Sequence, residues 1–167
     1  PDLIIKLVTS TQWESINSKI VCLGDSELFL ARSKLINKKI KIRELQSVDT
    51  SIKNKKGVLQ LYKVSNCVDL SPKKLNARNA KYVIDHLDFG IKYCNANKKV
   101  GLVTGPIQKS NIIDAGYKTR LSANYNQALA EIDKKLPDVA LLDLKLDKGD
   151  NDGIELLSHI KSKNKDI

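Results

Sequence analysis

The sequence predicts an α/β fold, a layered and mostly parallel sheet with flanking helices. Between residues 19 and 116, short apolar runs alternate with segments of helical periodicity, which is typical of parallel strands joined by helices. The apolar run 100–104 ends in a turn and enters a helical pattern that stops at Gly116. A similar alternation follows, with a helix predicted over 123–135 and a buried strand over 137–143.

Composition limits the class of protein. The chain has 167 residues, of which 41% are hydrophobic and 5% aromatic, so a core must consist mainly of Ile, Leu and Val. No apolar run reaches the ~18 residues of a membrane span, and the opening residues do not resemble a signal peptide. We therefore expect a soluble cytoplasmic protein with no membrane partner.

The formal net charge of +10 raises the question of nucleic acid. The lysines are scattered along the chain in short groups, such as 38–39, 53–56, 73–74 and 98–99, and only four residues are Arg. Charge indicates a binding surface only where it clusters, and Arg is the usual reader of bases. We expect no nucleic-acid partner.

The three cysteines are Cys22, Cys67 and Cys94. They lack the close spacing of metal ligands, and their number is odd. They are expected to be reduced, partly buried thiols of a cytosolic protein.

The first elements follow from local pattern. Residues 1–8 predict a short helix, and Trp13 is expected in a polar loop that covers the edge of the core. The run 19–24 predicts a strand, and Ser26 is a candidate cap for a helix over 27–36.

Gly24 and Asp25 lie at the turn between this strand and helix. A cofactor role there is left open, but one glycine is not a dinucleotide-binding fingerprint.

Further along, 39–43 and 57–64 predict strands, and 74–95 predicts the clearest helix. His86 lies beside the apolar stripe of this helix. It is expected to be exposed or partly packed, with a role as catalytic base as the alternative.

The segment 100–116 carries the candidate site. Thr104 and Gly105 would lie at the carboxyl end of a strand, where open α/β sheets bind ligands. Gly105 allows a ligand to approach the backbone closely, Pro106 suits a first helical turn, and Lys109 can reach an anion there. We assign Thr104, Gly105 and Lys109 to the positioning of a substrate or anion.

Several segments in order resemble one family. The helix beginning at 75–84, the run VGLVTGPIQKSNIIDAG at 100–116 and the opening residues 1–5 resemble the 4-hydroxythreonine-4-phosphate dehydrogenase family of vitamin B6 synthesis. The resemblance covers about residues 1–121. It implies NAD-dependent oxidation of the small phosphorylated substrate 4-phosphooxy-threonine, with NAD and a divalent metal as cofactors, in a homodimer.

The same resemblance leaves catalysis unassigned. The family's Gly-His-Thr-Glu segment does not follow the DAG residues, and neither His86 nor His159 lies in a context that matches its metal ligands. No catalytic residue and no metal ligand is assigned, and no turnover is expected from this chain alone.

The remaining residues resemble a different family. From 122 to 163 the chain resembles the middle of a response-regulator receiver domain, with Asp143 in the place of the phosphoacceptor. That resemblance implies Mg²⁺ and a histidine kinase as partners. The family's other phosphoryl-binding residues are missing, and the acidic loop 147–153 lacks the ligand order of an EF-hand.

We therefore expect two partial pieces, 1–121 dehydrogenase-like and 122–167 receiver-like. Three hypotheses stay open: an incomplete dehydrogenase, a phosphorelay signalling module that uses Asp143, and an inactive fusion. In one arrangement, strand 137–143 would extend the sheet that ends at 100–104 and give a single hybrid sheet.

Overall fold

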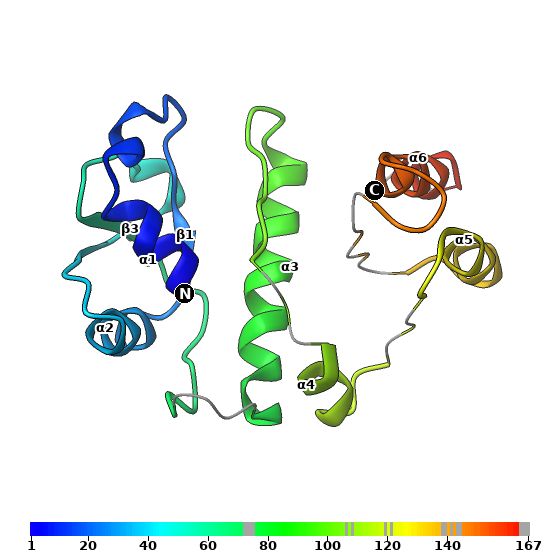
Figure 1. The fold of residues 1–167 in the computed structure, drawn as a ribbon, viewed down its shortest axis with the longest axis horizontal. Helices are drawn as coiled ribbons and strands as arrows, with labels where there is room; N and C mark the ends of the chain where they lie inside the picture. The colour runs from blue at the N-terminus through cyan, green and yellow to red at the C-terminus, as the bar shows by residue number, and fades with distance from the viewer. Residues whose placement is uncertain are drawn as a thin grey trace. The chain divides into compact units, whose positions relative to one another are not determined.

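The computed structural model describes residues 1–71, 76–105, 107, 109–118, 120, 122–137, 140, 142 and 145–163. The chain divides into two compact units, Pro1–Tyr117 and Lys118–Ile167. Figure 1 shows the elements of each unit in chain order.

The first unit contains a parallel three-stranded sheet, which confirms the predicted fold class. The strands are β1 (Cys22–Leu23), β2 (Lys41–Glu44) and β3 (Val58–Tyr62), in the order β1-β3-β2. Both β1 and β2 pair with β3 in parallel, with Cys22 opposite Leu61 and Lys41 opposite Val58. Since the three strands run in the same direction, their carboxyl ends point to one edge of the sheet and their amino ends to the other.

Helices α1 (Asp2–Val8) and α2 (Ser26–Leu35) pack with β3 around the main core. The buried residues of this core are Ile5, Val8, Trp13, Phe29, Leu59 and Leu61. Leu59 and Leu61 are two positions apart on β3 and so point to one face of the sheet. An ion pair between Arg32 and Asp2, at 2.6 Å, joins the two helices at the surface.

Trp13 differs from its prediction. It lies in the short 3-10 helix η1 (Thr11–Ser15) and is fully buried in the core, whereas the sequence placed it in a loop at the edge. The polar residues around Trp13 in the sequence predicted an exposed segment. Burial depends on which residues pack against a side chain in space, so the sequence did not predict it.

Two buried amides fix the loops around the sheet. Asn54 accepts from the N–H of Ile20 and donates to the carbonyls of Ile16 and Ser18. Gln60 exchanges hydrogen bonds with the backbone of Ile52. Each buried amide bonds to the backbone of a neighbouring loop, so these loops are held in defined positions.

The long helix of the first unit is α3 (Ala80–Ala96), preceded by η3 (Ala77–Asn79). Phe89 on α3 stacks on Tyr62 at the end of β3, with ring centroids 4.9 Å apart. A further short 3-10 helix, η2 (Val48–Thr50), lies within the loop predicted over 46–56.

The predicted strand 100–104 is not formed. Residues 100–105 have no regular secondary structure, and Val103 is 93% exposed. A strand exists only where its backbone groups pair with a neighbour, and an apolar run alone does not supply that neighbour. The segment runs back along α3, as Figure 1 shows, and continues into α4 (Lys109–Asp114).

The second unit contains α5 (Tyr125–Lys134) and α6 (Asp152–Lys163). They pack around Ile132, Leu156 and Ile160. Of the predicted strand 137–143, positions 138, 139, 141 and 143 lie outside the described residues, and 137, 140 and 142 have no regular secondary structure.

Candidate functional site

The carboxyl ends of β1 and β3 lead into a polar network centred on Asp25. Asp25 is 2% exposed, follows β1 directly and is the N-cap of α2. Its Oδ1 accepts from the N–H of Glu27 at 2.8 Å. Its Oδ2 accepts from the N–H of Cys67 at 3.2 Å and pairs with Lys63 Nζ at 3.1 Å. The sequence suggested Ser26 as the cap of this helix, but the structure shows that the cap is Asp25.

The surroundings of Asp25 favour the ionised form of its carboxyl group. Burial opposes its ionisation, but the Lys63 ammonium and the N–H groups of Cys67 and Glu27 outweigh burial and hold the pKa of the carboxyl below its ordinary value. Both carboxylate oxygens accept from the protein's own groups, and at 2% exposure the side chain is not accessible to a ribose hydroxyl.

Gly24 is needed for packing. A Cβ at Gly24 would lie 2.5 Å from Cε2 of Phe29 and 3.3 Å from Oη of Tyr82. This space is filled by the protein's own rings, so the structure does not favour the cofactor role left open for Gly24 and Asp25.

Tyr82 and His86 form the wall of this network on α3. The N–H of Asp25 donates to Oη of Tyr82 at 3.1 Å, and the rings of Tyr82 and His86 lie 4.2 Å apart. Burial raises the pKa of the Tyr82 hydroxyl. As a result this hydroxyl stays protonated and serves as a neutral partner.

His86 is 8% exposed, more buried than the sequence suggested. Its Nδ1 lies 2.6 Å from the carbonyl of Tyr82, which selects the tautomer protonated at Nδ1. Burial lowers the pKa of His86, and its buried Nε2 has no hydrogen-bond partner among the described residues. The ring is thus neutral and packed, with no carboxylate positioned to make it a base.

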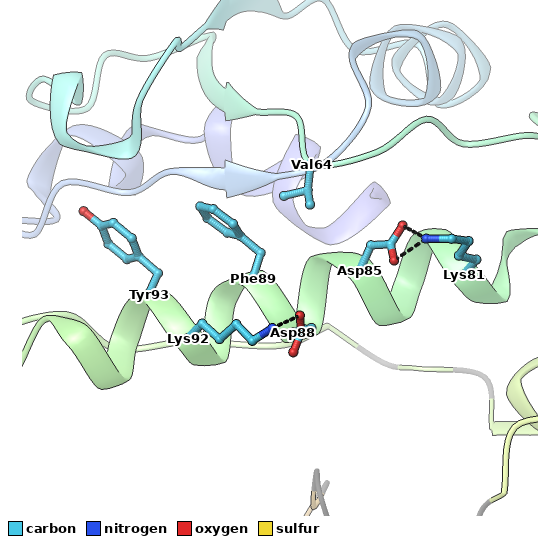
Figure 2. A pocket seen from close by; sticks show the side chains of 7 residues that line it. All are labelled: Val64, Lys81, Asp85, Asp88, Phe89, Lys92 and Tyr93. Atoms are coloured by element: carbon cyan, nitrogen blue, oxygen red, sulfur yellow. Dashed lines mark hydrogen bonds and ion pairs between the residues drawn. The ribbon is translucent and has the colours of Figure 1, made fainter.

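Helix α3 and Val64, which follows β3, line a groove of about 460 Å³, shown in Figure 2. Lys81 pairs with Asp85 and Lys92 pairs with Asp88, each at 2.7 Å. Phe89 and Tyr93 supply an aromatic side to this groove, and Val64 faces them from the segment after β3. Because each lysine is matched by a carboxylate one turn away, the groove carries no net charge to attract an ion.

The predicted anion-positioning residues lie in the segment that follows α3. Leu102 packs onto this helix, since a Cβ at Gly90 would lie 2.9 Å from Cδ1 of Leu102 and 3.3 Å from Cδ1 of Leu23. Thr104 and Gly105 are exposed, and a Cβ at Gly105 would meet nothing within 4 Å. The backbone at Gly105 is therefore open to the approach of a ligand.

Lys109 is the first residue of α4, and Pro106 lies outside the described residues. The helix ends as expected at Gly116, which has φ +84°. The N–H of Gly116 donates to the carbonyl of Ile113 and that of Tyr117 donates to Ile112, which is a Schellman motif. The structure thus shows Thr104 and Gly105 exposed, with no strand formed over residues 100–105, and Lys109 at the start of α4.

In the second unit, Asp143 lies outside the described residues, so its proposed phosphorylation stays a prediction. The acidic loop that precedes α6 closes on itself. Asp152 is 2% exposed, and its Oδ2 accepts from the N–H groups of Leu146 and Lys148 at 3.1 and 3.0 Å. This carboxylate therefore orders the loop instead of facing a cation.

The residues that the structure describes do not fit a metal. They contain no group of three or more His, Cys, Asp or Glu side chains arranged to hold an ion. His86 is buried against Tyr82, and His159 contacts Asp133 at 2.7 Å in the other unit.

The cysteines Cys22, Cys67 and Cys94 are free thiols, as expected, and burial raises the pKa of Cys22 to about 12. Nor does any helix within the described ranges have the length and apolar character that crossing a membrane requires.

Comparison with known proteins gives one consistent result. A family model described as "Pyridoxal phosphate biosynthetic protein PdxA" matches residues 15–142. The 4-hydroxythreonine-4-phosphate dehydrogenase of Yersinia pseudotuberculosis serotype O:1b (strain IP 31758) is 34% identical over 116 residues, which are 70% of this chain and 34% of the relative.

Relatives from two other organisms give the same result. The protein of the same name from Methylococcus capsulatus (strain ATCC 33009 / NCIMB 11132 / Bath) is 35% identical over 97 residues, 58% of this chain and 29% of the relative. That from Azoarcus sp. (strain BH72) is 27% identical over 116 residues, 70% of this chain and 33% of the relative. The chain spans about a third of the length of these curated relatives.

Proposed function

This chain belongs to the PdxA family of pyridoxal phosphate biosynthetic proteins, and on that premise we propose that it supplies the substrate-positioning part of an oxidoreductase. The proposed reaction is that of 4-hydroxythreonine-4-phosphate dehydrogenase, the NAD-dependent oxidation of 4-phosphooxy-threonine. One observation carries the proposal: the family match spans residues 15–142 and therefore includes residues 104–109.

The exposure of Thr104 and Gly105 supports a positioning role. Thr104 and Gly105 are exposed, so a hydroxyl and an open backbone are both accessible to a phosphorylated ligand. Lys109 adds a cation four residues beyond Gly105. Hydrogen bonds from a hydroxyl, a backbone N–H and an ammonium group are sufficient to orient a negatively charged phosphate group.

The part of the chain that the structure describes does not complete the reaction by itself. It holds no ligand set for the metal that the dehydrogenase resemblance implies. The network at Asp25, which lies where an open sheet binds ligands, is already occupied by the protein's own groups. In this proposal the oxidation needs residues beyond those described, in the cytoplasmic homodimer that the resemblance implies.

The receiver hypothesis has less support. The family match reaches residue 142 and so covers most of the segment assigned to a receiver strand. Phosphorylation of Asp143 with Mg²⁺ and a histidine kinase is therefore kept only as the alternative.

The test measures binding and turnover separately. Calorimetric titration with 4-phosphooxy-threonine is expected to show binding by the wild-type chain, and Lys109→Gln is expected to weaken it about tenfold, as for loss of one charge-assisted hydrogen bond. Lys99→Gln, an exposed lysine outside the turn, serves as the matched control. With NAD and a divalent metal added, no NADH is expected from the chain alone.

Three results would contradict the proposal. The positioning role is wrong if both lysine variants bind alike, or if the unphosphorylated amino acid binds as tightly as the phosphorylated one. NADH formation above background would show that the chain is catalytically complete.

A further inference from the structure

A second groove, of about 770 Å³, lies at the amino ends of β2 and β3. Lys41 begins β2 and Val58 begins β3, so this groove lies at the sheet edge opposite to the Asp25 network. The cationic groove, as we call it, is lined by six lysines: Lys34, Lys38, Lys39, Lys41, Lys55 and Lys56. These residues come from the end of α2, the loop after it, the start of β2 and the loop before β3.

The backbone under these lysines is fixed. Helix α2 ends in a Schellman motif, in which Asn37 adopts φ 52° and the N–H of Lys38 donates to the carbonyl of Ser33 at 2.9 Å. The N–H of Lys41 donates to the carbonyl of Gly57 at 2.7 Å. The N–H of Val58 donates to the carbonyl of Lys55 at 2.9 Å. These bonds hold the two lysine-bearing loops next to each other before any ligand arrives.

The charge of the cationic groove is not neutralised. All six lysines are exposed, and none of them takes part in an ion pair with the described residues. Among the described residues, no acidic side chain lines the groove. Glu14, which accepts a hydrogen bond from the backbone N–H of Lys56, bonds to the main chain and not to an ammonium group. In the α3 groove, by contrast, both lysines form ion pairs with aspartates.

We propose that the cationic groove binds the phosphate backbone of a nucleic-acid duplex, independently of base sequence. Several unpaired ammonium groups side by side match a row of phosphates, and release of the counterions around those phosphates favours binding. The lining contains no Arg for reading bases and no aromatic ring on which single-stranded bases would stack. The inference does not rest on the proposed dehydrogenase function.

This proposal replaces the expectation of no nucleic-acid partner. That expectation depended on the lysines being scattered along the chain. The fold brings the groups 38–39 and 55–56 together across one groove, which supplies the clustering that the sequence did not show.

The test is fluorescence anisotropy of a labelled duplex of about 20 base pairs, titrated with the 167-residue chain at several salt concentrations. If all six lysines contact phosphates, the slope of log K against log salt is about −5, and affinity falls about 10³-fold between roughly 50 and 200 mM salt. In the variant K38Q/K39Q/K55Q/K56Q the slope is expected near −2, so the same change of salt weakens binding only about tenfold.

The control variant K98Q/K99Q/K118Q/K161Q removes the same net charge from exposed lysines outside the cationic groove. Its slope and its low-salt affinity are expected to stay close to those of wild type. Circular dichroism of both variants checks that each is folded. Equal losses in the two variants would mean that net charge alone drives binding, which overturns the proposal. Tighter binding of a single strand of equal charge would overturn its assignment to a duplex.

Discussion

Replacing Asp25 is expected to destabilise the first unit because three donors converge on one buried carboxylate. In Asp25→Ala, loss of the N-cap of α2 costs about 1 kcal/mol. The N–H of Cys67 loses its acceptor, which costs about another 1 kcal/mol. Lys63 is partly exposed and regains water, so its ion pair adds less than about 1 kcal/mol. The free energy of unfolding should fall by about 2–3 kcal/mol.

Trp13 provides the assay. It is the single tryptophan of the chain and is fully buried in the core of the first unit, so its fluorescence follows the unfolding of that unit in urea. Asp88→Asn is the control, because Asp88 forms only an exposed pair with Lys92 on α3. The control should change the free energy of unfolding by less than about 0.5 kcal/mol.

The pH dependence gives a second, independent reading. The pKa of the Asp25 carboxyl lies below its ordinary value of 3.8 in the folded protein, so ionisation of this group favours folding. The stability advantage of wild type over Asp25→Asn should be fully present above about pH 4 and should decline as the pH falls through the lower folded value. An Asp25→Ala variant within about 0.5 kcal/mol of wild type, or an advantage that persists unchanged in acid, would refute the role given to this network.

Two glycine substitutions test the packing and the turn. Gly24→Ala places a methyl group 2.5 Å from the Phe29 ring, so we expect a loss of about 1–3 kcal/mol in the free energy of unfolding, measured by Trp13 fluorescence in urea; unchanged stability would show that the space at Gly24 is not filled by the protein. Gly116→Ala forces a side chain into φ +84°, which costs about 1 kcal/mol and should speed amide exchange across α4. Gly101→Ala, at an open position, is its control, and equal exchange in the two variants would contradict the requirement for glycine.

The helices were the most predictable part of the fold. The apolar spacing over 74–95 anticipated α3 (Ala80–Ala96), and the Gly at 116 anticipated the end of α4. Both signals are local, because helical hydrogen bonds join residues four apart and a helix end depends on the next two residues. The strands were located to within a few residues wherever a parallel neighbour existed to pair with them.

The candidate site was predicted less well. Asp25 and Ser26 are both good capping residues in adjacent positions, and only the approach of Lys63 and Cys67 from after β3 decides between them. Thr104 and Gly105 were predicted at the carboxyl end of a strand; both are exposed, but the strand over 100–104 is not formed. A pattern of apolar residues indicates which segments can form strands. Whether a strand forms depends on a neighbouring strand from another part of the chain.

The fold class, the family and the spacing of residues 104–109 were all predictable from the sequence, since each signal lies in residues close together along the chain. The fold was needed to show that Trp13 is fully buried in the core, that Asp25 bonds to the protein's own groups through both carboxylate oxygens and that six lysines line one groove. The physical reason is that burial and electrostatic potential are sums over neighbours in space. Residues 38–39 and 55–56 become neighbours only when the parallel sheet aligns the starts of β2 and β3.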